Sequence, residues 1–133
     1  MKGVLTVILM TVAILLAVSS CATVSKEPLE PGELRLLSLD VPENGNLRIN
    51  IAYRIGIKFR ADGKPEIRRA CFYWSGDGPY CVWVKDVEYG SDASVEVPIY
   101  PRVDQNRLEC YVEYVRGGKI RRSNTVTSLV NGY

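Results

Sequence analysis

Carboxylates are the residues of this chain that could perform acid–base chemistry. Two pairs stand at short spacing, Asp86 with Glu88 and Glu109 with Glu113. Two carboxylates can hydrolyse a glycosidic bond when the environment holds one of them protonated. Each pair has the spacing expected for the solvent-facing side of a strand, and nothing nearby in the sequence gives a reason for a raised pKa. A carboxylate-based hydrolase is therefore the alternative interpretation of function.

Other catalytic chemistry lacks its usual residues. Histidine is absent from all 133 residues, which removes the commonest general base and the commonest transition-metal ligand. The serines have no histidine partner, and the cysteines form no CxxC pair that would predict a zinc site. We therefore expect no catalytic residue, no metal and no cofactor. A formal net charge of +2 also gives no electrostatic reason to expect a nucleic-acid partner.

The first cysteine follows a segment that has the pattern of an export signal. Lys2 precedes an apolar run from Val4 to Val18, and small residues then lead into Cys21. This order is typical of a secretory signal peptide. The sequence Val18-Ser19-Ser20-Cys21 resembles the lipobox of bacterial lipoprotein precursors. The resemblance implies cleavage before Cys21, a diacylglycerol on its sulfur and acylation of the new amino terminus.

Lipidation would attach the protein to a membrane and so determine its location in the cell. Several acyl chains hold a protein durably on a bilayer, whereas one chain does so only marginally. The alternative is an uncleaved membrane helix, because the chain has no charge from Gly3 to Ser25. Both interpretations place the rest of the chain on the same side of the membrane. We expect a lipid-anchored protein of the cell envelope, and Ala22 resembles the sorting signal for the periplasmic face of the outer membrane if the organism is Gram-negative.

Three segments follow from these patterns. Residues 1–20 are predicted to be the signal peptide, and residues 21–33 the lipidated cysteine with a flexible tether. Pro28, Pro31 and Gly32 disfavour helix and strand in that tether. Residues 34–133 are predicted to form one β-sandwich domain, a common size for a single core.

Alternation of apolar and polar residues dominates the predicted domain. Leu37, Leu39 and Val41 are expected to share the inner face of a first strand. Residues 47–60 alternate strictly and predict one long second strand, with a bend or bulge near Gly56. Five further strands are expected at about residues 67–74, 80–87, 95–99, 107–116 and 120–130, with turn residues between them.

About seven short strands without a helix predict an all-β antiparallel sandwich. Their order and lengths resemble an immunoglobulin-like or fibronectin-type sandwich, with Trp74 in the place of the core tryptophan. The second strand has no cysteine, and Leu108 stands where that family has its corner tyrosine. The resemblance therefore concerns the architecture and no named family.

The remaining cysteines are expected to form one disulfide. If residues 67–74 and 80–87 form a hairpin, Cys71 and Cys81 lie opposite each other on its outer face, close enough to bond. Cys110 falls among inward-facing apolar residues and is expected to behave there as a small hydrophobic side chain. A Cys71–Cys110 bridge is the alternative.

The same alternation places an aromatic patch beside this bridge. Tyr73, Trp83 and Tyr111 are expected on the outer face of one sheet, with the loop residues Asp77 and Tyr80 at the rim. Exposed aromatic patches are typical of partner or sugar sites. The alternative is that the rings only cover the disulfide and shield the sheet.

These observations predict a non-catalytic binding or scaffolding module anchored in the envelope. Its partner would be another envelope protein or a cell-wall glycan. The alternatives are the hydrolase described above, or an inhibitor or accessory subunit of an envelope enzyme complex.

Overall fold

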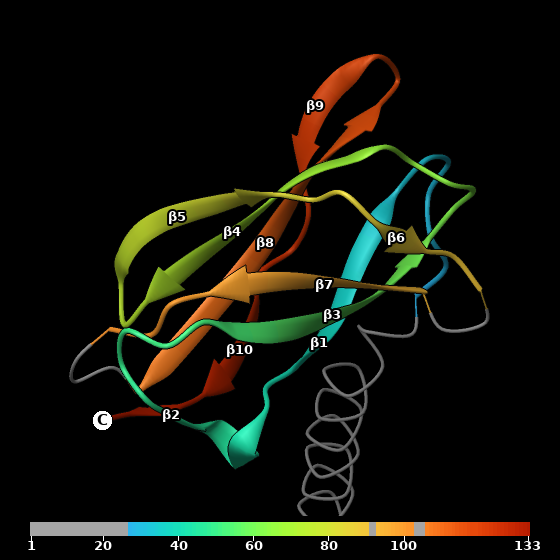
Figure 1. Ribbon diagram of the computed structural model, residues 1–133. Helices are drawn as coiled ribbons and strands as arrows, with labels where there is room; N and C mark the ends of the chain where they lie inside the picture. The colour runs from blue at the N-terminus through green and yellow to red at the C-terminus, as the bar shows by residue number, and fades with distance from the viewer. Residues whose placement is uncertain (1–26, 91–92, 103–105) are drawn as a thin grey trace, which may run out of the picture.

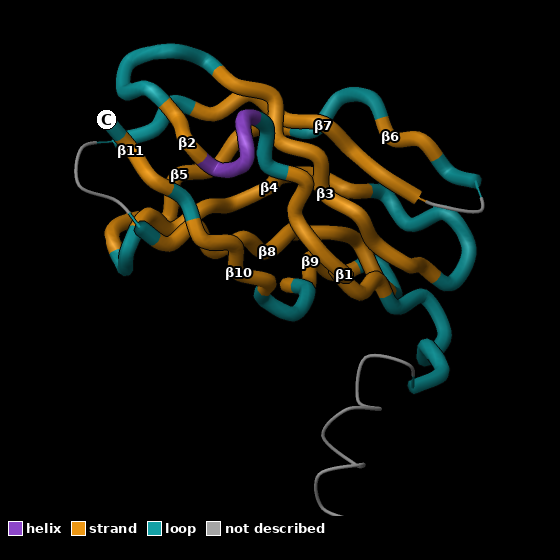
Figure 2. The backbone as a smooth tube through the Cα atoms, turned by 90° about the horizontal axis from the view of Figure 1, so that it is seen from below, coloured by secondary structure: helices purple, strands orange, loops and turns teal. Residues whose placement is uncertain are grey.

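The computed structural model describes residues 27–90, 93–102 and 106–133. The predicted signal peptide and Cys21 lie outside the described residues. Within the described ranges the chain forms two packed sheets, seen from two directions in Figures 1 and 2. No helix in these ranges is long and apolar enough to cross a bilayer.

The first sheet has the strand order β1-β3-β7-β6, and the second has the order β10-β8-β4-β5, with β9 paired to β8. All pairs within these two sheets are antiparallel. The strands of the first sheet are β1 (Leu34–Asp40), β3 (Tyr53–Ala61), β6 (Val87–Glu88) and β7 (Ala93–Ile99). Those of the second are β4 (Ile67–Trp74), β5 (Asp77–Trp83), β8 (Arg107–Arg116), β9 (Lys119–Arg122) and β10 (Val126–Leu129). A 3-10 turn η2 (Glu43–Gly45) precedes β2 (Asn46–Leu47), which pairs in parallel with β11 (Asn131–Gly132).

The all-β sandwich expected from the sequence is confirmed. The strand order of the two sheets is that of an immunoglobulin-like sandwich. Trp74 on β4 is 3% exposed and lies in the core, as the resemblance implies. Among the described residues the count of strands rises to eleven, because β2, β6 and β11 are two-residue pairings and the last predicted strand is split into β9 and β10.

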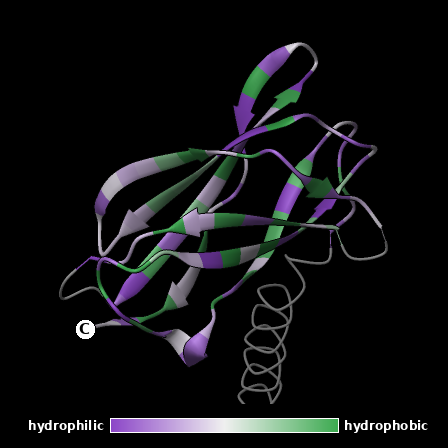
Figure 3. Cartoon of the chain, viewed as in Figure 1, coloured by the Kyte–Doolittle hydropathy of each residue, from purple (hydrophilic) through white to green (hydrophobic). Residues whose placement is uncertain are grey.

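The core lies between the inner faces of the two sheets. Hydropathy alternates along several strands (Figure 3), and β3 and β7 each have one buried face and one more exposed face. From the first sheet, Ile55, Ile57 and Phe59 on β3 are almost fully buried, and β7 adds Val95 and Val97. The second sheet covers these side chains with Ala70, Phe72, Leu108, Val112 and Tyr114.

The predicted inner face of the first strand is wrong at Leu37, although Leu39 and Val41 do pack against the core. Leu34 and Leu36 are the buried residues of β1, and Leu37 is 45% exposed. The strand begins three residues earlier than expected, and its pairing with β3 shifts between Leu36 and Ser38. This bulge brings Leu39 back against the core, although Leu37 points outward.

The single long second strand is also wrong. The predicted run of residues 47–60 is divided into β2 and β3, and the break lies at residues 48–52 rather than near Gly56. Asn50 has φ 61°, a left-handed conformation that a strand does not accommodate. Ile51, which the alternation placed inside, is 44% exposed.

The two edges of the sandwich differ. On one side the Asn124 side chain joins β1 to the second sheet, because its Oδ1 accepts a hydrogen bond from the Leu36 N–H at 2.8 Å and its Nδ2 donates to the Leu36 carbonyl at 3.0 Å. On the other side β5 is an edge strand, and the chain crosses from it to β6 in the opposite sheet.

Candidate functional site

The outer face of β5, β4 and β8 carries most of the predicted site residues in three rows. Trp83, Arg69 and Glu113 are register partners in one row. Cys81, Cys71 and Tyr111 form the next row. Tyr73, opposite Glu109, belongs to the third row. The disulfide therefore lies between Trp83 and Tyr73.

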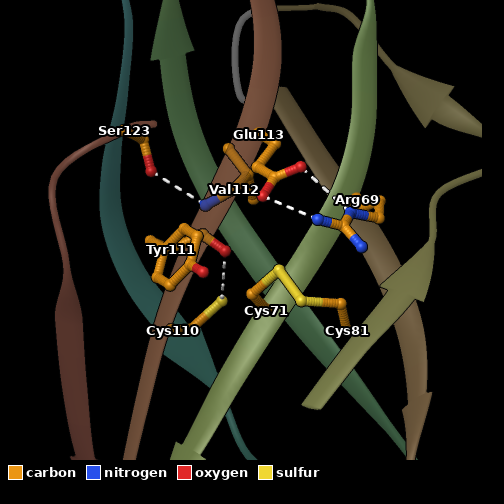
Figure 4. The surroundings of a disulfide bond; sticks show 8 residues. All are labelled: Arg69, Cys71, Cys81, Cys110, Tyr111, Val112, Glu113 and Ser123. Carbon is orange, nitrogen blue, oxygen red and sulfur yellow. Dashed lines mark hydrogen bonds and ion pairs between the residues drawn. A yellow bond between two sulfur atoms is a disulfide. The ribbon is translucent and has the colours of Figure 1, made fainter. Parts of the chain in front are cut away.

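The Cys71–Cys81 disulfide is present, as alternation predicted (Figure 4). The two cysteines are direct register partners, with Cα atoms 4.0 Å apart. Cys110 is free and fully buried on the opposite face of the same sheet. Burial raises the pKa of its thiol to about 12, so it remains a neutral thiol at physiological pH.

An ion-pair row lies beside the disulfide. The Arg69 guanidinium donates two hydrogen bonds of 2.9 Å to the Glu113 carboxylate. These bonds hold the pKa of Glu113 below its ordinary value, although partial burial acts in the opposite direction. The Arg69 guanidinium also lies 5.8 Å from the centre of the Trp83 ring. The row therefore fixes Arg69 between a carboxylate and an indole.

The two tyrosines cover the disulfide row. The ring centres of Tyr73 and Tyr111 are 6.2 Å apart, and the Arg122 guanidinium lies 4.8 Å over the Tyr111 ring. Tyr111 is only 4% exposed, and burial raises its pKa above the ordinary value. These two rings are placed to shield the sheet, which leaves little of Tyr111 for a ligand.

Trp83 differs from the tyrosines because 65% of its surface is exposed. It forms one wall of a hollow of about 500 Å³, which we call the Trp83 groove. The groove lies where the chain leaves β5, passes over to β6 and meets the edge of β7. Its polar and ring-bearing residues are Trp83, Lys85, Asp86, Glu88, Ser94, Glu96, Pro98 and Arg54.

The predicted rim residues Asp77 and Tyr80 lie elsewhere. Tyr80 is opposite Phe72, so its ring turns toward the interior face, away from Trp83. Its hydroxyl donates a 2.8 Å hydrogen bond to Asp77, which raises the pKa of the tyrosine. Arg102 pairs with Asp77 at 3.1 Å and lies 4.0 Å over the Tyr80 ring. This cluster borders a separate apolar hollow of about 260 Å³ between the sheets.

The two carboxylate pairs have different surroundings. Glu109 forms an ion pair with Arg107 at 3.0 Å, and Glu113 forms one with Arg69. Both carboxylates are therefore already engaged by arginines. Asp86 and Glu88 both line the Trp83 groove and are exposed to solvent. Within residues 27–133 as described, no group of three His, Cys, Asp or Glu side chains could hold a metal ion.

Sequence reasoning missed the groove and several of its residues. Arg54 on β3 and Glu96 on β7 form an exposed ion pair at 3.1 Å across the groove wall. Lys85 and Pro98 complete the wall around Trp83. The opposite charges of Arg54 and Glu96 are visible in the sequence, but their meeting depends on the pairing of β3 with β7. Their place beside Trp83 depends on the crossing from β5 to β6.

The chain matches no protein-family model, no curated protein and no solved structure.

Proposed function

We propose that this protein is a lipid-anchored, non-catalytic binding module of the bacterial cell envelope, and that Trp83 and its groove form the ligand surface. The observation that carries the proposal is the indole of Trp83, 65% exposed at the end of a paired strand and backed by Arg69. A large exposed ring costs a folded domain solubility, so a ring held in this way favours a role in contact with a partner.

The chemistry of the groove favours a glycan over a protein partner. A sugar presents apolar C–H faces and a rim of hydroxyl groups. The Trp83 ring offers a flat surface for such a face, and Pro98 adds an apolar wall. Asp86, Glu88 and Glu96 can accept hydrogen bonds from hydroxyls, while Arg54 and Lys85 can donate them. The mixture of charges, with three carboxylates against two cations, suits a hydroxyl-rich ligand without a strong net charge.

The same groove holds the Asp86–Glu88 pair, which is the observation that favours a hydrolase as second candidate. A general acid in glycoside hydrolysis needs an environment that excludes water from its carboxyl group. Both side chains are exposed. They are therefore better suited to hold ligand hydroxyls than to transfer a proton.

The anchor is proposed from residues 1–21, whose apolar run and final cysteine resemble a lipoprotein precursor. Two or three acyl chains on Cys21 would hold the domain at a membrane surface for long periods. A binding module at that position would tie its glycan ligand to the bilayer.

Titration of the full-length processed protein with soluble cell-wall glycan fragments tests the function. Trp74 is buried, so a saturable change in tryptophan fluorescence would report Trp83. Calorimetry should show that Trp83→Ala weakens binding at least about fivefold, since stacking on an aromatic ring contributes about 1–3 kcal/mol. Tyr100→Ala is the matched control, because Tyr100 is 64% exposed and lies outside the groove.

Two results would count against the proposal. Equal glycan affinity of wild type and Trp83→Ala would show that the Trp83 groove does not bind the glycan. Release of cleaved glycan that stops in Asp86→Asn or Glu88→Gln would replace the binding module by the hydrolase.

A further inference from the structure

The β8–β9 hairpin projects beyond the sandwich (Figure 1). Its sequence near the turn is rich in cations. Gly117 and Gly118 form its turn, both with positive φ, and every residue of β9 is exposed. Ile120, near the tip, is 57% exposed. The cations at the turn end of the hairpin are Arg116, Lys119, Arg121 and Arg122.

The turn end of this hairpin holds the segment through which the chain enters the domain, because Arg116 directly precedes the turn. The Arg116 Nε donates to the Pro31 carbonyl at 3.0 Å, and its Nη2 pairs with Glu30 at 3.0 Å. The Gly32 N–H donates to Asp62 at 2.8 Å, which fixes the same segment from the other side. The tether predicted for residues 21–33 is therefore docked on the domain over its last residues.

This docking limits how far the turn end of the hairpin can lie from an anchor at Cys21. Only six residue steps separate Cys21 from Glu27, whose carbonyl accepts a 2.7 Å hydrogen bond from Arg35. Six steps of extended chain span at most about 20 Å. Lipid on Cys21 would therefore keep Glu27 within that distance of the bilayer surface. It would keep the turn end of the hairpin, which is docked on Glu30 nine residue steps from Cys21, within about 30 Å.

The charges of the hairpin are available for an outside partner. Arg116 is engaged by Glu30, and Arg122 lies over Tyr111. Lys119 and Arg121 form no ion pair within the part of the chain that the structure describes. A hollow of about 560 Å³ opens between Arg116, Lys119 and Arg121. Its size and charge fit a phosphate-bearing headgroup.

We propose that the β8–β9 hairpin is a second membrane contact, which lies against anionic lipid headgroups and sets the orientation of the domain. This inference rests on the lipid anchor of the proposed function. Each cation close to an anionic surface strengthens attraction about fivefold. Ile120 adds an apolar side chain that can enter the interfacial region.

A fluorophore at the hairpin tip tests this contact in the full-length lipidated protein. Ile120→Cys provides the labelling site, because Cys71 and Cys81 are bonded and Cys110 is buried. The protein is reconstituted into vesicles of phosphatidylcholine alone or with phosphatidylglycerol, both containing a quencher lipid. We expect strong quenching only with phosphatidylglycerol. A label at Asn131→Cys, near β2 at the other end of the domain, should be quenched equally weakly in both (Figure 1).

Charge variants identify the residues responsible. Lys119→Gln with Arg121→Gln should abolish most of the additional quenching, since two cations are lost at about fivefold each. Arg48→Gln with Lys58→Gln removes the same net charge away from the hairpin and should leave the quenching unchanged. Equal quenching in both vesicle types, or full quenching in the hairpin variant, would overturn the inference. Flotation with phosphatidylcholine vesicles reports the anchor separately, so a failed anchor and a failed hairpin contact give different results.

Discussion

Cys71 and Cys81 lie directly opposite each other on β4 and β5, and their sulfur atoms are bonded. The bond ties the edge strand β5 to the centre of its sheet. Trp83 is two residues beyond Cys81 on the same face, opposite Arg69. The disulfide therefore stabilises the strand that holds the proposed ligand-binding ring.

Loss of this bond should destabilise the domain without unfolding it. The two cysteines are 10 residues apart in sequence, and closure of a loop of this size contributes about 2–3 kcal/mol. Urea denaturation of Cys71→Ala with Cys81→Ala should show a decrease of that size in the free energy of unfolding. Peptide mapping of the wild type without reductant should find Cys110 free, and a link from Cys71 to Cys110 would contradict the structure.

The ion pair between Arg69 and Glu113 predicts a pH dependence of stability. The Arg69 hydrogen bonds lower the pKa of Glu113 below 4.5, so the folded state favours the charged carboxylate. This contribution is complete above the pKa of the unfolded chain and is lost as the pH falls through the lower, folded value. Wild type should therefore be more stable than Glu113→Gln at neutral pH, with the difference shrinking in acid below 4.5.

Urea midpoints of the two proteins across the acid range measure that difference. Arg54→Gln supplies a control, because its pair with Glu96 is exposed on both sides and surface pairs contribute little. A difference between wild type and Glu113→Gln that stays constant with pH would show that the carboxylate charge is not what stabilises the fold.

Leu36 and Leu37 are adjacent on β1 but should respond very differently to truncation. Leu36 is 3% exposed and Leu37 is 45% exposed. Leu36→Ala should lower the free energy of unfolding by about 2–4 kcal/mol, because it leaves a cavity in the core. Leu37→Ala should change it by less than about 1 kcal/mol. A larger loss of stability in Leu37→Ala than in Leu36→Ala, measured by thermal or urea denaturation, would contradict the structure. It would show that Leu37 faces the core, as alternation alone predicted.

Alternation predicted the fold where apolar residues recur without interruption. Ile55, Ile57 and Phe59 identified β3, and the matching parity of Cys71 and Cys81 identified the disulfide. The same rule failed at Ile51. The positive φ of Asn50 interrupts the strand, although apolar and polar residues continue to alternate across this position. It failed again at Leu37, where three leucines in four positions permit either face and a bulge decides.

The proposed ligand surface was predicted only in part. Trp83 was placed correctly on the outer face, but the groove beside it joins residues from both sheets. Local sequence does not reveal such a meeting, because it depends on where the chain crosses from β5 to β6. Tyr80 was expected at the rim, although it shares the parity of Val82, which faces inward. That parity would have indicated its true position.

The proposal that the protein is lipid-anchored through Cys21 is tested most directly by the mass of the mature protein extracted from membranes. The account predicts a chain that begins at Cys21 and carries the added mass of a diacylglycerol and an amide-linked acyl chain. Cys21→Ser should give an unlipidated chain that keeps residues 1–20. A wild-type protein that begins at residue 1, or one that begins elsewhere without attached lipid, would contradict the account.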